Sequence, residues 1–261
     1  PMIKLSPKCI LITGASSGLG AALARYYAES GVTLHISGRN KERLSQTALQ
    51  CRERGAEVYE VVVDAGDMNA MANWTQLAMR KSGNLDLVIA NAGISGGTST
   101  TDRSRVIDDE STRNIMAINI AGVLNTVLPV IPPMTEKRHG QIAIISSIAG
   151  FRGMPSAPAY SASKAAVKAY GEALRPRLAT HNVRLSVVMP GFIESRITDA
   201  NNFSMPMIMT ADKAARIIAC GLSKNKARIA FPVPMAFAAW LVACLPPSLT
   251  DRFLTRLPSK T

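Results

Sequence analysis

The chain has 261 residues, 47% of them hydrophobic, and a net charge of +12. This length and composition favour one α/β domain over residues 1–261, and three histidines and four cysteines without ligand spacing argue against a structural zinc site. Residues 131–261 carry 17 basic and 6 acidic side chains. This basic excess could form a solvated surface, or it could attract an anionic substrate or carrier or an anionic membrane. Binding to nucleic acid is not indicated, because no basic stretch has the interleaved aromatics expected for it.

Short apolar runs alternate with longer helical segments along the chain. Parallel strands covered on both faces have this nearly continuous apolar character. The sequence therefore predicts a Rossmann-type doubly wound parallel sheet of about seven strands with helices on both faces. The expected strands are Cys9–Thr13, Thr33–Ser37, Glu57–Val63, Leu85–Ala90, Gln141–Ser146, Val183–Met189 and Arg228–Phe231, and the expected helices include Ala21–Ser30, Lys41–Arg54, Asn69–Lys81 and Ser161–Thr180.

A glycine-rich turn follows the first expected strand directly and leads into a helix. Glycines allow such a turn to bend sharply and to approach a pyrophosphate, whose charge the helix N-terminus stabilises. A glycine turn alone is a weak signal, but the flanking strand and helix supply the required context. The predicted cofactor-binding residues here are Gly14, Ser16, Ser17, Gly18, Leu19 and Gly20.

The second strand ends next to Arg39. An acidic residue at this place would bind the ribose 2′-hydroxyl of NAD and repel a phosphate there, whereas a guanidinium can bind a 2′-phosphate. The sequence therefore predicts NADP in preference to NAD.

Two further strand ends are expected to border the cofactor. Asp64, followed by Ala65, ends the third strand and is placed to accept a hydrogen bond from the adenine amine. The fourth strand runs into Asn91, Ala92 and Gly93, and the small residues of this motif permit the cofactor to lie against the backbone.

Ser147 follows the fifth strand, and Tyr160 and Lys164 open the next helix. Residues at i and i+4 share one face of a helix, so the Lys164 ammonium is expected near the Tyr160 phenol. A nearby positive charge favours the phenolate, and Lys164 and the charge of the nicotinamide, acting together, would lower the tyrosine pKa toward neutrality. This pattern predicts acid–base chemistry.

Over residues 8–231 the chain resembles the short-chain dehydrogenase/reductase family. The motifs that carry the resemblance occur in the family's order: Thr13-Gly-x-x-x-Gly-x-Gly20, Asn91-Ala92-Gly93, Asn119, Ser147, Tyr160-x-x-x-Lys164 and Pro190-Gly191.

The resemblance implies a role for each matched residue. Tyr160 would act as the general acid or base, and Ser147 would hydrogen-bond the substrate oxygen. Lys164 would bind the nicotinamide ribose and lower the pKa of Tyr160, while Asn119 would hold a water that links Lys164 to solvent. The segment 190–195 would contact the carboxamide, through Pro190, Gly191, Ile193 and Ser195.

Two segments are expected to shape the substrate side. Residues 192–212 contain Phe203, Met205, Met207, Ile208 and Met209, and flexible methionines suit an apolar substrate lid; ordinary loop packing is the alternative. Residues 232–261 form an extension with a long apolar stretch between basic flanks, too short to span a bilayer. It could contact an anionic membrane, pack on a partner subunit or cover the substrate site.

Residues 1–8 contain no apolar run of signal-peptide length, and we expect Cys9, Cys51, Cys220 and Cys244 to be buried, reduced thiols. These features predict a cytoplasmic protein, with attachment to the inner face of a membrane as the open alternative. The resemblance implies a homodimer or homotetramer.

The function predicted is the NADP-dependent interconversion of a ketone or oxoacyl group and a secondary alcohol, on a bulky apolar substrate. An epimerase or dehydratase on the same fold, or an NADP-binding sensor without turnover, are the alternatives. The intact set of Asn119, Ser147, Tyr160 and Lys164 favours the oxidoreductase.

Overall fold

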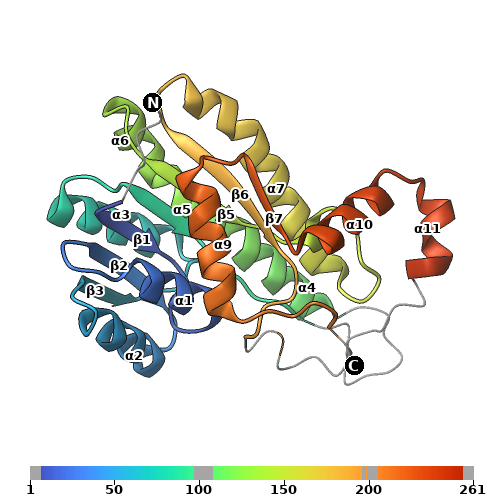
Figure 1. The fold of residues 1–261 in the computed structure, drawn as a ribbon, viewed down its shortest axis with the longest axis horizontal. Coiled ribbons are helices and arrows are strands. Elements are labelled where there is room, and N and C mark those ends of the chain that lie inside the picture. Colours follow the sequence, from blue (N-terminus) through green and yellow to red (C-terminus); the bar gives the residue numbers. More distant parts are fainter. Residues whose placement is uncertain (1–6, 97–107, 196–197, 199–204, 255–261) are drawn as a thin grey trace.

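The computed structural model describes residues 7–96, 108–195, 198 and 205–254. A seven-stranded parallel sheet in the order β3-β2-β1-β4-β5-β6-β7 crosses the molecule (Figure 1). The predicted doubly wound fold is therefore confirmed. The strands are β1 (Cys9–Ile12), β2 (Thr33–Gly38), β3 (Glu57–Val62), β4 (Leu87–Ala90), β5 (Gln141–Ile145), β6 (Arg184–Pro190) and β7 (Arg228–Phe231).

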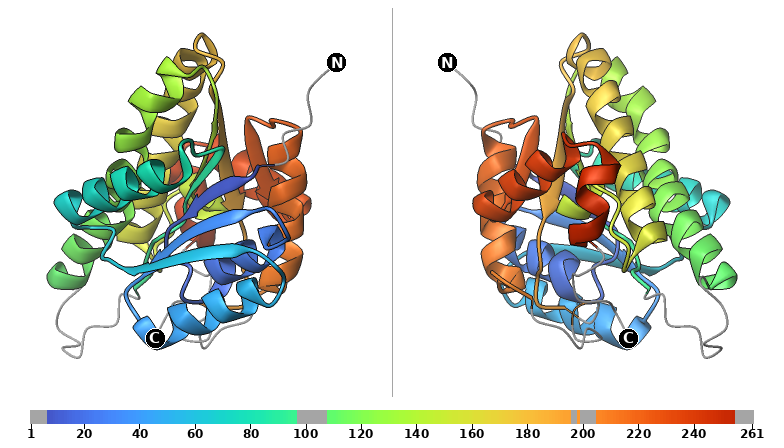
Figure 2. Two further views of the ribbon diagram at one scale, coloured as in Figure 1. Left: turned by 90° about the vertical axis from the view of Figure 1, so that its left-hand side faces the viewer. Right: turned by 90° about the vertical axis from the view of Figure 1, so that its right-hand side faces the viewer.

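Helices cover both faces of the sheet, as Figure 2 shows edge-on. One face packs against α1 (Gly18–Tyr27), α2 (Lys41–Arg52) and α9 (Ala211–Ser223), and the other against α3 (Met68–Ser82), α5 (Gly122–Val127) and α7 (Pro158–Ala179). The remaining helical segments are α4 (Asp109–Met116), η1 (Ala117–Ala121), η2 (Leu128–Val130), α6 (Ile131–Glu136), η3 (Ile148–Gly150), α10 (Val233–Ala243) and α11 (Pro247–Leu254).

The apolar strands form the common floor of two hydrophobic cores. Alternate residues of β5 belong to different cores: Ala143 and Ile145 face one helical layer, whereas Ile142 and Ile144 face the other. All five residues of β5 are buried. This double burial explains why the strand reads as a continuous apolar run rather than an alternating one.

Element boundaries differ from the predicted ones by a few residues. Helix α7, which contains Tyr160 and Lys164, begins at Pro158 rather than at the predicted Ser161, because proline is well suited to the first turn of a helix. By length and composition, the helical run 109–136 could cross a membrane. It packs on the sheet through α5 and carries Asn119, as the core helix of a folded domain does.

The expectation that all four cysteines are buried is wrong for two of them. Cys9 and Cys51 are buried, whereas Cys220 and Cys244 are exposed. Cys220 lies on α9 but is not among its buried residues, and Cys244 caps the C-terminal end of α10. An apolar helix segment does not by itself tell which residues face the core.

His35 provides a test of the core on the β2–β3 side. The buried ring stacks on Tyr59, and its Nε2 lies 2.7 Å from the Ser82 hydroxyl. Burial lowers the pKa of His35 to about 4. Between pH 6.5 and 4, His35 is therefore protonated in the unfolded chain but neutral in the folded chain. The stability that neutral His35 contributes is complete above pH 6.5 and is lost as the pH falls toward 4.

When the pH is lowered from 7.5 to 4.5, we expect the free energy of unfolding to decrease more in wild type than in His35→Gln. The difference between the two decreases should be at most about 3 kcal/mol. Urea unfolding at the two pH values measures this difference. Equal losses in both proteins would show that His35 is not the proton-linked group.

Candidate active site

A cavity of about 1330 Å³ lies at the carboxyl ends of the strands, where a doubly wound sheet binds its ligands. It brings together most of the predicted site, from segments far apart in the sequence. The predicted residues that line it are Gly14, Ser16, Ser17, Gly18, Leu19, Arg39, Asp64, Ala65, Asn91, Ala92, Gly93, Ser147, Tyr160, Lys164, Pro190, Gly191, Ile193 and Ser195. Gly20 and Asn119 do not line the cavity themselves. Gly20 packs against Gly14, and Asn119 is hydrogen-bonded to Ile94, and both of these neighbours line it.

The glycine turn has the geometry that its sequence predicts. Gly14 and Gly18 adopt positive φ angles of 68° and 55°, which residues with a side chain rarely adopt. A Cβ on Gly20 would lie 2.2 Å from the Gly14 carbonyl oxygen. Gly20 is therefore required for the close packing of the turn on helix α1, rather than for direct contact with a ligand.

Asn91 holds the glycine turn against the end of β4. Its Nδ2 donates to the Thr13 carbonyl oxygen at 2.9 Å, and its backbone N–H donates to the Thr13 hydroxyl at 3.0 Å. The Ala92 N–H donates to the same hydroxyl. The predicted cofactor residue Asn91 thus acts on the shape of the cradle, a role that the sequence motif alone does not reveal.

Helix α1 begins at this cradle without a side-chain cap at Ser17. The first N–H groups of a helix have no partner within the helix and carry partial positive charge. Ser17, Gly18 and Leu19 all line the cavity. This wall is therefore suited to a phosphate, and the turn leaves room for a pyrophosphate because its glycines carry no side chains.

Two guanidinium groups lie at the end of β2. Arg39 is more than half exposed, and its Nη1 is 3.9 Å from the Asp64 carboxylate. Asp64 also accepts a hydrogen bond from the Gly66 N–H at 2.8 Å. Arg43 lines the same part of the cavity, and its buried Nε has no hydrogen-bond partner among the described residues. Sequence analysis missed Arg43, although its spacing of four from Arg39 could have indicated it.

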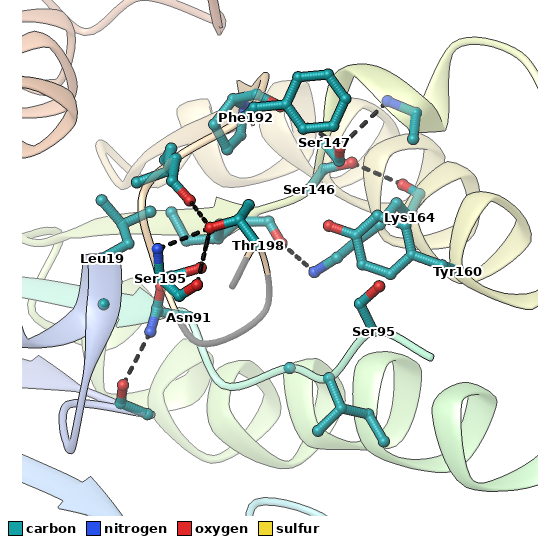
Figure 3. A pocket seen from close by; sticks show the side chains of 18 of the residues that line it. Leu19, Asn91, Ser95, Ser146, Ser147, Tyr160, Lys164, Phe192, Ser195 and Thr198 are labelled. Carbon is teal, nitrogen blue, oxygen red and sulfur yellow. Dashed lines mark hydrogen bonds between the residues drawn. The ribbon is translucent and has the colours of Figure 1, made fainter. Parts of the chain in front are cut away.

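Tyr160, Lys164 and Ser147 converge on one wall, as the close-up in Figure 3 shows. The Lys164 ammonium lies 5.7 Å from the centre of the Tyr160 ring and donates to the Ile145 carbonyl oxygen at 3.0 Å. The Ser146 hydroxyl donates to the Lys164 carbonyl oxygen at 2.7 Å. These two bonds fix the first turns of α7 to the end of β5, which brings the i and i+4 pair to the serine.

Burial is the main cause of the pKa shifts of Tyr160 and Lys164. It raises the pKa of Tyr160, and a hydrogen bond with Ser147 opposes it. Burial also lowers the pKa of Lys164 to about 8. The expectation that Lys164 and the nicotinamide charge together lower the pKa of Tyr160 concerns the enzyme with bound cofactor and stays a prediction.

Asn119 lies in a π-helical segment between α4 and α5, a type of helix that is frequent at functional sites. Its side chain is fully buried, accepts from the Ile94 N–H at 2.8 Å and donates to the Ile94 carbonyl oxygen and the Ser163 hydroxyl. A Cβ on Gly93 would approach Asn119 Oδ1 to 3.1 Å and Lys164 Nζ to 3.4 Å. Asn119 therefore fixes the loop after β4 beside Lys164.

Comparison with known proteins identifies the fold and motifs as those of one family. The family model for short chain dehydrogenases matches residues 8–205. The chain belongs to the short-chain dehydrogenase/reductase family. An uncharacterized oxidoreductase from Myxococcus xanthus is 36% identical over 98% of this chain and 100% of its own length. The protein is thus an NAD(P)-dependent oxidoreductase.

Solved structures show the same fold. A short-chain dehydrogenase/reductase from Burkholderia phymatum, in complex with NAD, has a TM-score of 0.83 at 23% identity and covers 100% of this chain and 99% of its own. Actinorhodin polyketide ketoreductase with NADPH has a TM-score of 0.77 at 24% identity, over 88% of this chain and 97% of its own.

The segment after β6 forms one wall of this dehydrogenase/reductase cavity. The Thr198 hydroxyl donates to the Ile193 carbonyl oxygen at 2.8 Å and accepts from the Ser195 N–H at 2.8 Å. Thr198 lines the cavity and was missed by sequence analysis, which considered only Ser195 at this place. A Cβ on Gly191 would lie 2.9 Å from Pro232, so this glycine lets the segment pack on the start of α10.

The predicted lid, residues 192–212, is described only in part. Phe203 lies outside the described residues. Met209 packs in the core, whereas Met207 and Ile208 are exposed, and the described apolar lining from this segment comes from Phe192, Ile193 and Pro206. The closing motion of the lid stays a prediction.

The apolar extension forms α10 and α11, shown in red in Figure 1 at the end of β7. One face of α10 lines the cavity through Met235, Ala238, Ala239 and Val242. The other face leaves Val233, Phe237, Trp240 and Leu241 exposed. Of the three alternatives for the extension, covering the substrate site is therefore the one that the described residues support directly. The helix is apolar on both faces, so residue spacing alone does not indicate which face lines the cavity.

Proposed function

We propose that this enzyme uses NADP to convert a ketone or oxoacyl group of a bulky, mostly apolar substrate to a secondary alcohol, or carries out the reverse reaction. The observation that carries the proposal is the convergence of Ser147, Tyr160 and Lys164 on a cavity that continues into a glycine cradle. When bound, the nicotinamide would supply or accept the hydride.

The side chains of the chain itself would handle the proton. A Tyr160 phenol with a raised pKa is protonated at neutral pH and can donate its proton to the substrate oxygen as negative charge develops there. Ser147 would donate a hydrogen bond to the same oxygen and stabilise the alkoxide. The Lys164 ammonium, held against Ile145, would offset the charge left on the phenolate.

NADP is favoured over NAD by the two guanidinium groups after β2. Arg39 is exposed enough to meet a 2′-phosphate, and Arg43 offers a buried N–H that still needs an acceptor. A phosphate with several oxygens can satisfy both groups. Arg43 would therefore share the selectivity for the 2′-phosphate with Arg39.

The substrate side supports a bulky apolar molecule. Beyond Tyr160, the cavity is walled by small and flexible apolar residues of α10, among them Ala238, Ala239 and Met235. Small side chains leave room that larger ones would fill. Three further points stay predictions. They are contact of the C-terminal segment with an anionic membrane, assembly into a homodimer or homotetramer, and a cytoplasmic location.

Oxidation of NADPH with a series of methyl ketones from 2-butanone to 2-undecanone tests the proposal. We expect kcat/KM to rise with chain length in wild type, and the Ala239→Phe variant to lose at least tenfold on the longest ketones while the shortest change little. An enzyme that prefers short ketones and does not respond to Ala239→Phe would contradict the assignment of α10 as substrate wall. No activity with any ketone would contradict ketone reduction itself.

A further inference from the structure

Among the described residues, the substrate end of the cavity is lined mostly by apolar side chains and by one cation. Its described lining includes Met154 from the loop before α7, Val242 from α10 and Leu254 from α11. Arg39, Arg43 and Asp64 belong to the dinucleotide end, and Lys164 to the catalytic wall. Among the described residues, Arg152 is therefore the charged side chain that lines the cavity at its apolar end.

Arg152 is largely buried and only partly satisfied. Its side chain is 24% exposed, and its buried Nε has no hydrogen-bond partner among the described residues. Buried polar groups in native proteins are nearly always hydrogen-bonded, and one that is not calls for an explanation such as an absent ligand. A guanidinium that lines a cavity and retains a free buried donor has the chemistry of a ligand-binding group.

The partners that Arg152 does have point to the kind of ligand. Its Nη2 donates to the Asp251 carboxylate at 3.2 Å and to the buried Thr250 hydroxyl at 3.1 Å, both on α11. The guanidinium thus already accommodates a carboxylate. Asp251 is 63% exposed and can return to solvent at little cost. A ligand carboxylate would take the place of Asp251 on the Nη2 side, and a rotation of the guanidinium would bring the unpaired Nε to its second oxygen.

We propose that Arg152 binds a carboxylate at one end of the apolar substrate, which makes the substrate class an oxo acid or the corresponding hydroxy acid. This inference rests on the proposed function and refines its substrate. On binding, the carboxylate replaces Asp251 on the guanidinium, and the apolar body lies along α10. The basic excess of the second half of the chain would favour the approach of such an anion.

Binding of octanoate and of octan-1-ol to the NADP⁺-loaded enzyme, followed by calorimetry, tests the inference. We expect Arg152→Met to weaken octanoate by about ten- to hundredfold and to leave octanol nearly unchanged, because only the acid loses a charge-assisted hydrogen bond. Arg152→Lys keeps the charge without the fork and should fall between wild type and Arg152→Met.

Asp251→Asn is the matched control for a purely structural role. This variant weakens the contact between Arg152 and α11 while it frees the guanidinium from a competing carboxylate, so octanoate should bind at least as tightly as to wild type. If Arg152 only anchors α11, Arg152→Met and Asp251→Asn should weaken octanoate and octanol alike. That result, or equal octanoate affinity in wild type and Arg152→Met, would overturn the inference.

Turnover separates this inference from the proposed function. Reduction of methyl ketones by wild type, combined with octanoate binding that ignores Arg152, would sink the carboxylate site alone. Octanoate binding that depends on Arg152, without reduction of any methyl or oxo-acid ketone, would sink the proposed reaction and leave the anion site standing.

Discussion

Tyr160→Phe is expected to lower kcat for ketone reduction by about 10²- to 10⁴-fold, the usual contribution of a positioned general acid. The phenylalanine ring fills the same buried place, so the affinity for NADPH should change little. Without the hydroxyl, the substrate oxygen loses its proton donor and retains only the hydrogen bond from Ser147. Stopped-flow reduction and fluorescence titration with NADPH measure the two quantities separately.

Tyr170→Phe is the matched control for this result. Tyr170 lies ten residues further along the same helix, α7, and packs on the core rather than lining the cavity. Its loss should leave kcat within a factor of about two, because no proton passes through it. An equal loss of activity in both variants would show that the effect of Tyr160→Phe is structural. Full activity in Tyr160→Phe would remove Tyr160 from the reaction and favour a binding protein or another chemistry.

Arg39→Asp and Arg43→Ala are expected to weaken NADPH by about ten- to hundredfold each, as for hydrogen bonds to charged groups. Arg39→Asp should also reverse the preference, because a carboxylate repels the 2′-phosphate and accepts from a ribose hydroxyl. The affinity for NADH should fall in neither variant. Titration of each protein with both cofactors gives the ratio.

Lys41→Ala controls for the loss of a positive charge near the same helix. Lys41 begins α2 but does not line the cavity. Its replacement should change the NADPH to NADH ratio by less than about threefold at physiological ionic strength, where exposed charges are screened. Equal binding of both cofactors by wild type would show that neither arginine selects the phosphate.

The order of elements and the catalytic wall could be predicted because local sequence determines them. A strand buried on both faces is apolar along nearly its whole length, as residues 142–145 of β5 are. The i and i+4 spacing places Tyr160 and Lys164 on one face of any helix that contains them. The glycine turn likewise follows from the residues that its φ angles require.

What the sequence did not predict depends on packing between distant segments. Arg152 meets α11 almost a hundred residues further along the chain, and α10 reaches the cavity only because Gly191 lets it pack closely. Burial, which periodicity does not report, raises the pKa of Tyr160. Apolar runs indicated a helix at α10 but not which of its faces would be exposed.

Transfer of deuterium from [4,4-²H₂]NADPH to 2-undecanone tests the central assignment most directly, because it follows the hydride itself. We expect one deuterium on the carbinol carbon of the alcohol formed by wild type, and at least 10²-fold less of this product in the same time with Tyr160→Phe. An alcohol without deuterium at that carbon, or the same yield of labelled alcohol from both proteins, would contradict it.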